Sequence, residues 1–186
     1  MVTQNSILDA AQSLFAQFGL KKVTTDDIAR KAHVSKATIY KFYKNKSEIF
    51  DVVVRLEAER LIREMEDWSW GSLLEKRAAA AALCEPCLLG DERQAEKVLQ
   101  ILDEITSSLG DVEERKSENI KALRKGLGYC WSVAVVANPG AGKPLMEKWM
   151  GSNDKDIVWI MKENLKKKRL ARMDAEWVVD CNQLIF

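Results

Sequence analysis

The sequence predicts an all-α protein, in which an N-terminal three-helix helix-turn-helix domain is joined by a long helix to a second helical domain. Three observations support this prediction. Helix-forming residues are abundant in the 186-residue chain, three prolines and nine glycines leave few breaks, and apolar residues recur at helical rather than alternating spacing. With 47% hydrophobic residues, the chain has enough apolar side chains to bury a core.

The first helix is predicted from residue 6, where Ile7, Leu14 and Phe18 belong to one apolar stripe. Gly19 ends this helix, because glycine readily adopts the positive φ that commonly follows a helix. A second, short helix begins after Thr24, which is followed three residues later by Asp27 in a capping-box pattern.

A turn and a third helix follow. His33 and Val34 form a tight turn, and Ser35 can cap a helix that runs through Lys41. Two short helices joined across a turn of about three or four residues form a helix-turn-helix.

A long helix then begins at Lys46, with Asn45 at its N-cap position, and keeps helical spacing to about Asp67. Further helices are predicted at 72–88, 91–108, 112–137, 143–150, 154–169 and 174–186. We therefore expect a head of residues 1–48 and a helical body of residues 49–186. The chain ends in apolar residues without a polar tail, so we expect a coding sequence truncated after Phe186.

Charge is distributed unevenly along the chain, although the formal net charge is only +1. Residues 1–50 hold eight Lys and Arg against four Asp and Glu, whereas the remainder holds 21 against 24. A basic head on a mildly acidic body indicates contact between the head and an anion. An uneven solvated surface remains the alternative.

The predicted third helix has two faces of opposite character. Val34, Ile39 and Phe42 or Tyr43 can face inward, and Lys36, Thr38, Tyr40 and Lys41 can face outward. A polar outward face suits the DNA major groove, which is about 12 Å wide. Thr24, Thr25 and Lys46 suit phosphate contacts near helix N-termini. An ordinary three-helix corner without a DNA partner has the same pattern.

The segment ILDAAQSLFAQFGLKKVTTDDIARKAHVSKATIYKFYKNKSEIF resembles the N-terminal signature of TetR-family transcriptional regulators. The resemblance runs almost unbroken over residues 6–50, about a quarter of the chain. It covers the stripe of the first helix, the two threonines before the second helix and the VSKATIY segment.

This resemblance implies roles for individual residues. The third helix would be the recognition helix, with Lys36 and Thr38 at base edges or nearby phosphates and Tyr40 on the DNA backbone. Thr25 and Lys46 would hold phosphates. The predicted DNA-binding residues are Thr24, Thr25, Ser35, Lys36, Ala37, Thr38, Tyr40, Lys41 and Lys46.

Three features depart from the pattern of the family. The turn residue is often glycine there and is His33 here, and histidine tolerates a left-handed conformation better than most residues. Phe42 stands where tyrosine or histidine is common, which removes one polar backbone contact. Residues 2–5 lack the basic side chains that many relatives carry before the first helix.

For the body, the resemblance implies an effector-binding and dimerisation domain. Similar regulators form a homodimer through two late helices, which here correspond to helices near 154–169 and 174–186; the same apolar stripes would also close the core of a monomer. Tyr129, Trp131 and Met161 are the predicted ligand-binding residues for a small, largely apolar effector. Aromatic residues at helical spacing are also common in cores.

Other functional classes have little support. Cys84 and Cys87 form a CxxC motif. A structural zinc site needs four ligands, and the single histidine lies in the head. We therefore expect no metal and no cofactor. Redox pairing of these thiols is an alternative to a structural role. The absence of a catalytic constellation predicts a protein that is not an enzyme. No membrane span or signal peptide is evident, so we expect a cytoplasmic protein.

These observations predict a ligand-responsive transcriptional regulator. We expect a repressor that binds a palindromic double-stranded DNA operator as a homodimer and is released by its effector. The alternative is a helical interaction protein that retains the fold without specific DNA binding.

Overall fold

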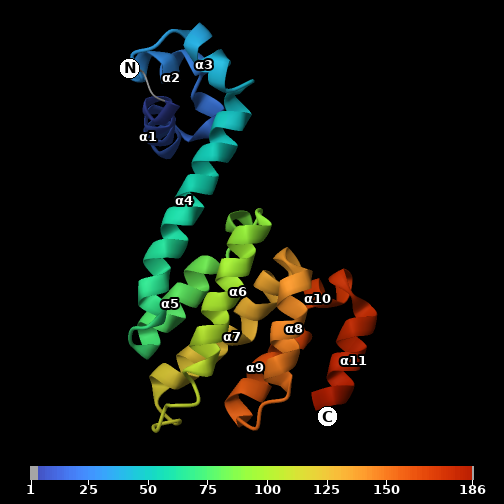
Figure 1. The fold of residues 1–186 in the computed structure, drawn as a ribbon. Coiled ribbons are helices and arrows are strands. Elements are labelled where there is room, and N and C mark those ends of the chain that lie inside the picture. The colour runs from blue at the N-terminus through green and yellow to red at the C-terminus, as the bar shows by residue number, and fades with distance from the viewer. Residues whose placement is uncertain (1–3, 186) are drawn as a thin grey trace. The chain divides into compact units, whose positions relative to one another are not determined.

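The structure is a computed structural model that describes residues 4–185 (Figure 1). These residues form α-helices and one short 3₁₀ helix without any strand, so the all-α prediction is confirmed. Over the same range no helix is long and apolar enough to cross a membrane. The predictions for residues 2–3 of the N-terminal arm and for Phe186 lie outside the described residues.

The residues group into two compact units, Met1–Ala58 and Glu59–Phe186, which we describe separately. The sequence-based boundary between residues 48 and 49 lies ten residues earlier. Both positions fall within one continuous helix, α4 (Lys46–Ser69), so no break in the backbone marks either of them.

Unit 1 begins with α1 (Gln4–Lys22), in which Gly19 makes a kink where the sequence predicted the end of the helix. Gly19 has a φ of 75°, a region that L-residues with a side chain rarely occupy. The helix resumes for a last turn that carries Lys21 and Lys22, so it extends three residues beyond the predicted end.

The next two helices are short and capped as the sequence predicts. α2 (Thr25–Lys31) has Thr24 as its N-cap in a complete capping box with Asp27, and α3 (Lys36–Phe42) has Ser35 as its N-cap. Between them, His33 adopts a φ of 55°, which confirms that histidine provides the left-handed turn residue.

The core of unit 1 joins α1, α2, α3 and the start of α4. Ile7, Ile28, Ile39 and Ile49 are completely buried and come one from each helix. Phe15, also in this core, meets the partly buried Phe50 edge to face, with ring centroids 5.3 Å apart. Short helices have little intrinsic stability, so this shared core fixes the position of α3.

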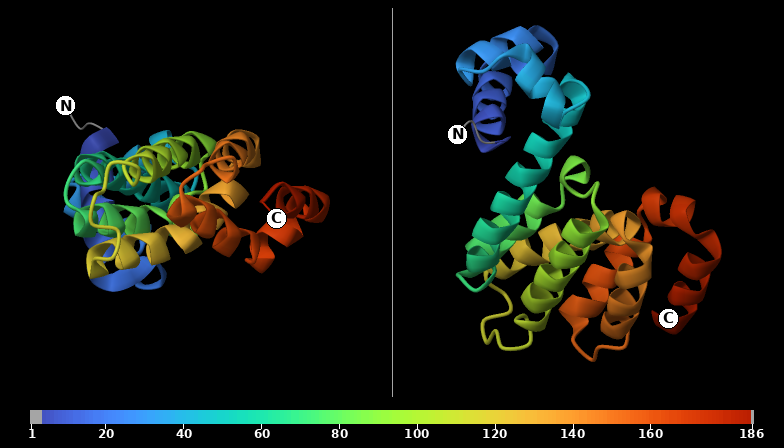
Figure 2. Two further views of the ribbon diagram at one scale, coloured as in Figure 1. Left: turned by 90° about the horizontal axis from the view of Figure 1, so that it is seen from below. Right: turned by 45° about the horizontal axis from the view of Figure 1, so that its top comes forward.

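Unit 2 is built around α7 (Glu118–Ala137; Figure 2). This helix packs against five other α-helices of the unit and against its short 3₁₀ helix. The remaining elements are α5 (Leu73–Leu83), η1 (Pro86–Leu88), α6 (Glu92–Ser107), α8 (Pro139–Met150), α9 (Lys155–Leu165), α10 (Lys168–Met173) and α11 (Ala175–Ile185). Trp131 of α7 is fully buried, and its Nε1 donates to Thr106 Oγ1 of α6 at 3.1 Å.

Several predicted boundaries in unit 2 were wrong. The helix expected at 72–88 ends at Leu83, because Pro86 lacks the N–H that a continuing helix needs. The helix expected at 112–137 begins only at Glu118, and the helix expected at 154–169 breaks between Leu165 and Lys168.

The helix expected at 143–150 begins earlier, at Pro139, where Asn138 accepts a hydrogen bond from the N–H of Ala141. Gly142 permits close packing of α8 on α7. A Cβ atom at this position would lie 2.8 Å from the Cα of Val135, closer than real contacts allow.

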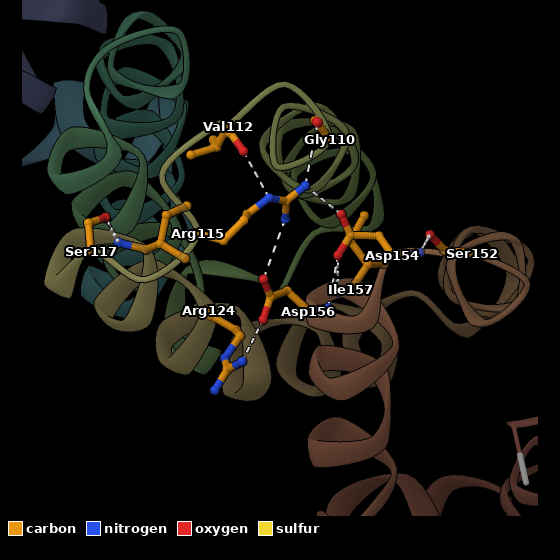
Figure 3. A network of polar contacts seen from close by, with 10 residues as sticks. Gly110, Val112, Arg115, Ser117, Arg124, Ser152, Asp154, Asp156 and Ile157 are labelled. Carbon is orange, nitrogen blue, oxygen red and sulfur yellow. Dashed lines mark hydrogen bonds and ion pairs between the residues drawn. The ribbon is translucent and has the colours of Figure 1, made fainter.

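A network of charged side chains holds the loop before α7 against the start of α9 (Figure 3). Arg115 contacts Asp154 at 2.7 Å and Asp156 at 3.4 Å, and Arg124 contacts Asp156 at 2.5 Å. The Arg124 guanidinium also lies 4.3 Å from the ring centroid of Trp159. Because these side chains are two-thirds or more shielded from solvent, the network is stronger than isolated surface pairs.

Burial raises the pKa of Asp154, but hydrogen bonds from Arg115 and from the backbone N–H groups of Asp156 and Ile157 outweigh that effect. The pKa of Asp154 therefore lies below its ordinary value. Asp154 is also the N-cap of α9, so its charge is favourable at the positive end of that helix.

Candidate nucleic-acid interface

The candidate DNA-binding surface is centred on the exposed side of α3. Ile39 is completely buried and anchors the opposite side of this helix in the core of unit 1. Lys36, Ala37, Tyr40 and Lys41 are exposed, and Thr38 is half-buried. The predicted division of α3 into inward and outward faces is therefore confirmed for these residues.

Ser35 and Thr38 form a local pair at the start of α3. Ser35 Oγ accepts from the backbone N–H of Thr38 at 3.0 Å, and the two hydroxyl oxygens lie 2.8 Å apart. The cap holds the first turn of α3 in place and fixes the direction of the Thr38 hydroxyl.

Lys36 is engaged within the protein. Its Nζ donates to Asp26 Oδ2 of α2 at 2.9 Å, and this hydrogen bond raises the pKa of Lys36. Both side chains remain about half exposed, so the pair is weak and can open or be shared with an approaching anion. The bond links the two helices of the helix-turn-helix.

The start of α2 presents Thr24 and Thr25, the first exposed and the second half-buried. The Thr24 hydroxyl lies 2.6 Å from Asp27 Oδ2, and this hydrogen bond lowers the pKa of Asp27. Thr24 is therefore fully used as a helix cap, and Thr25 stands at the first position of α2, where backbone N–H groups point outward.

Lys46 makes contacts that the sequence did not indicate. Its Nζ donates to the carbonyl oxygens of Leu20 and Val23, each at 2.8 Å, and the side chain is partly buried. An ammonium group has three donors, so two are used inside unit 1 and one remains for a phosphate. The phosphate contact of Lys46 stays a prediction. In addition, Lys46 has a structural role, because it holds the carbonyl groups of Leu20 and Val23.

Phe42 and Tyr43 differ in environment. Tyr43 is buried, with 3% of its surface exposed, whereas Phe42 is 44% exposed, so the inward-facing member of the pair is Tyr43. The hydroxyl of Tyr43 is buried without a hydrogen-bond partner among the described residues. An unpartnered polar group in an apolar core is unfavourable.

The three predicted ligand-binding residues differ in environment. Trp131 and Met161 have no exposed surface and belong to the core of unit 2, so their contact with an effector stays a prediction. Large aromatic and thioether side chains at helical spacing serve the core equally well, and the sequence pattern does not distinguish the two. Tyr129 is 45% exposed, and its hydroxyl accepts from Arg169 at 2.7 Å.

The cysteines show no metal-binding arrangement. Among residues 4–185, no group of three or more His, Cys, Asp or Glu side chains could hold a metal ion. Cys87 is exposed, whereas Cys84 is buried. A hydrogen bond with Cys130 and burial raise the pKa of Cys84 well above its usual range, so this thiol is a poor nucleophile. The redox alternative for Cys84 and Cys87 therefore loses support.

Comparison with known proteins finds similarity within the first unit. Residues 7–53 match the family model described as "Bacterial regulatory proteins, tetR family". The chain is 47% identical over 60 residues to "Uncharacterized HTH-type transcriptional regulator YhgD" of Bacillus subtilis (strain 168), covering 32% of this chain and 29% of that protein.

A second relative extends further. The chain is 27% identical over 157 residues to "Probable acrEF/envCD operon repressor" of Escherichia coli (strain K12), covering 73% of this chain and 66% of that protein. The chain thus spans less than two thirds of the length of each of these relatives. A solved structure of SmeT from Stenotrophomonas maltophilia aligns with 98% of this chain and 86% of that chain, at 17% identity and a TM-score of 0.38.

Proposed function

We propose that this chain is a DNA-binding transcriptional repressor and not an enzyme, since residues 7–53 match the model of the TetR family of bacterial regulatory proteins. The observation that carries this proposal is the exposed side of α3. It presents Lys36, Tyr40 and Lys41 to solvent, while buried Ile39 and the Ser35 cap fix the helix behind them.

We assign two kinds of contact to this surface. Lys36 and Thr38, near the start of α3, would reach base edges in the major groove, where lysine and threonine read bases by hydrogen bonding. Thr25, Tyr40, Lys41 and Lys46 would contact the phosphate backbone, which positions the helix without reading sequence. Lys36 would exchange its pair with Asp26 for a contact with DNA.

Homodimer formation is proposed through the C-terminal helices, with α11 as the main contributor. The apolar residues Ile157, Ile160 and Leu165 of α9 are buried in the core of unit 2. By contrast, Val179 and Leu184 of α11 are 56% and 73% exposed, although both are apolar. Exposed apolar side chains on a terminal helix favour a partner surface there. A two-fold dimer would present two copies of α3 to half-sites about 34–36 Å apart.

A small effector bound in unit 2 would release the repressor by stabilising a form that fits the operator poorly. Such control needs different affinities of the effector for two states of the protein. Helix α4 is our candidate transmitter, because its residues belong to both units.

The test is fluorescence anisotropy with a duplex from the region upstream of the gene, compared with a shuffled duplex of the same composition. The proposal expects tighter binding to the natural duplex and a steep decrease in affinity with salt. Equal, weak binding to both duplexes would favour a helical interaction protein that has kept the fold. Exposed Phe42 agrees with that alternative, because a phenyl ring offers no hydrogen bond to a phosphate.

A further inference from the structure

Unit 2 contains a cleft of about 310 Å³ next to the short helix η1. The lining residues are Pro86, Leu89, Val133, Val136, Ala137 and Arg169. The first five are apolar, and Arg169 is the only charged side chain of the lining. A mostly apolar pocket with one placed polar group is the usual form of a small-molecule site, and this volume is at the small end of the range.

Arg169 is held in a defined direction at this cleft. Its Nη2 donates to the hydroxyl of Tyr129 at 2.7 Å, and its guanidinium carbon lies 4.5 Å from the centroid of the Tyr129 ring. Tyr129 therefore does not line the cleft but positions the residue that does.

In the described part of the chain, the Arg169 guanidinium contacts the hydroxyl and the ring of Tyr129 and no carboxylate within 4.0 Å. Lys167, whose Nζ lies 5.9 Å from the Tyr129 ring centroid, adds positive charge beside it. Five apolar neighbours and an uncompensated cation together favour a ligand with an apolar body and one negative group.

We propose that this cleft binds an amphipathic monocarboxylate. The two oxygen atoms of the carboxylate would accept two parallel hydrogen bonds from the guanidinium of Arg169, because the spacing of its N–H donors matches theirs. The hydrocarbon part would pack against Leu89, Val133 and Val136. Arg169 lines the cleft and Lys167 does not, so one guanidinium meets the ligand and balances the single charge of a carboxylate, whereas the nearly double charge of a phosphate monoester would exceed it.

Only the role of this ligand as the effector rests on the proposed function, because binding of the ligand to the cleft requires no DNA. Isothermal titration calorimetry with octanoate and with 1-octanol tests it, since the two probes share one hydrocarbon chain and differ in charge. Arg169→Met should lower the affinity for octanoate about tenfold or more and leave octanol within about twofold.

A matched control lies on the same helix. Arg172 is exposed and does not line the cleft, so Arg172→Met should bind both probes as the unsubstituted protein does. Val136 is 37% exposed and lines the cleft, so Val136→Trp should block both probes while the far-ultraviolet circular dichroism spectrum stays unchanged.

Several results would overturn the assignment. They are equal affinity of the unsubstituted protein for octanoate and octanol, no octanoate binding at millimolar concentration, unchanged octanoate binding by Val136→Trp, or equal losses in Arg169→Met and Arg172→Met. If the protein binds its upstream DNA but fails these tests, the inference fails alone. If octanoate binds as expected and no duplex does, the proposed function fails and the ligand site stands.

Discussion

The Nζ atom of Lys46 lies 2.8 Å from the carbonyl oxygen of Val23, and the same distance separates it from the carbonyl oxygen of Leu20. The first residue of α4 is thereby tied to the end of α1 and to the segment that leads into α2. Carbonyl groups beyond a helix end need donors, and here a charged side chain supplies them. Lys46 thus supports the position of the helix-turn-helix as well as offering charge to DNA.

Lys46→Met should therefore destabilise unit 1 even without DNA. The expected loss is about 1–3 kcal/mol, because two partly buried carbonyl oxygens lose a charged donor. Urea unfolding followed by circular dichroism measures it, with Lys44→Met as the control, since the Lys44 side chain is exposed. Equal stability of the two variants would show that the Lys46 contacts contribute nothing to folding.

Tyr43→Phe should stabilise the protein by about 1 kcal/mol. The substitution removes a buried hydroxyl that lacks a hydrogen-bond partner in the described chain and keeps the ring that fills the core. Tyr40→Phe is the matched control, because the Tyr40 side chain is 49% exposed and its hydroxyl can be hydrated. A decrease in thermal stability on Tyr43→Phe would mean that the hydroxyl has a partner in solution.

Acid stability should depend on the ion pairs of Arg115. The pKa of Asp154 lies below its usual 3.8 in the folded protein, so its contribution to stability is present above that value and is lost as the pH falls through the lowered pKa. Arg115→Met should narrow the difference in unfolding midpoint between pH 7 and pH 3. Lys116→Met, at an exposed neighbouring position, should leave that difference unchanged; a similar narrowing in both variants would argue against the network.

Substitution of a base-reading residue and of a phosphate-contacting residue should have different effects on DNA binding. Thr38→Ala should change the order of affinities among operators with single-base substitutions, by about 1–3 kcal/mol at one position. Lys41→Met should weaken binding to every duplex and reduce the salt dependence by about one unit. Both are measured by anisotropy at several salt concentrations. If Thr38→Ala lowers affinity uniformly, Thr38 does not read bases.

Val179→Glu should weaken the proposed dimer, because it places a charge on the exposed apolar surface of α11. Analytical ultracentrifugation should show a shift toward monomer, with a parallel loss of operator affinity. Leu74→Glu adds the same charge at an exposed apolar position of α5, outside α11, and is the control. A monomeric unsubstituted protein at micromolar concentration would remove the basis for this prediction.

Features that depend on neighbours in sequence could be predicted. The Thr24 and Asp27 capping box, the Ser35 cap and the positive φ of His33 each follow from residue types a few positions apart. The core position of Ile39 follows from helical periodicity. These local signals predicted a helix from Lys36 through Lys41, and the structure ends α3 one residue later, at Phe42.

Features that depend on distant residues could not be predicted. The contacts of Lys46 with Leu20 and Val23 join positions more than twenty residues apart. The cleft at Arg169 brings together η1, α7 and α10, and no pattern within any one of them indicates it. Helical periodicity likewise could not indicate that the Nε1 of Trp131 donates to Thr106, twenty-five residues earlier in the chain.

The central claim is that the exposed side of α3 reads DNA. Its most direct test is the ratio of the dissociation constants for the natural upstream duplex and for its shuffled counterpart, measured by anisotropy near physiological salt. The account predicts a preference of about a thousandfold or more for the natural duplex, and a large reduction of that preference in a variant that combines Lys36→Met with Thr38→Ala. A ratio near one for the unsubstituted protein, at every salt concentration and with any segment of the upstream region, would contradict it.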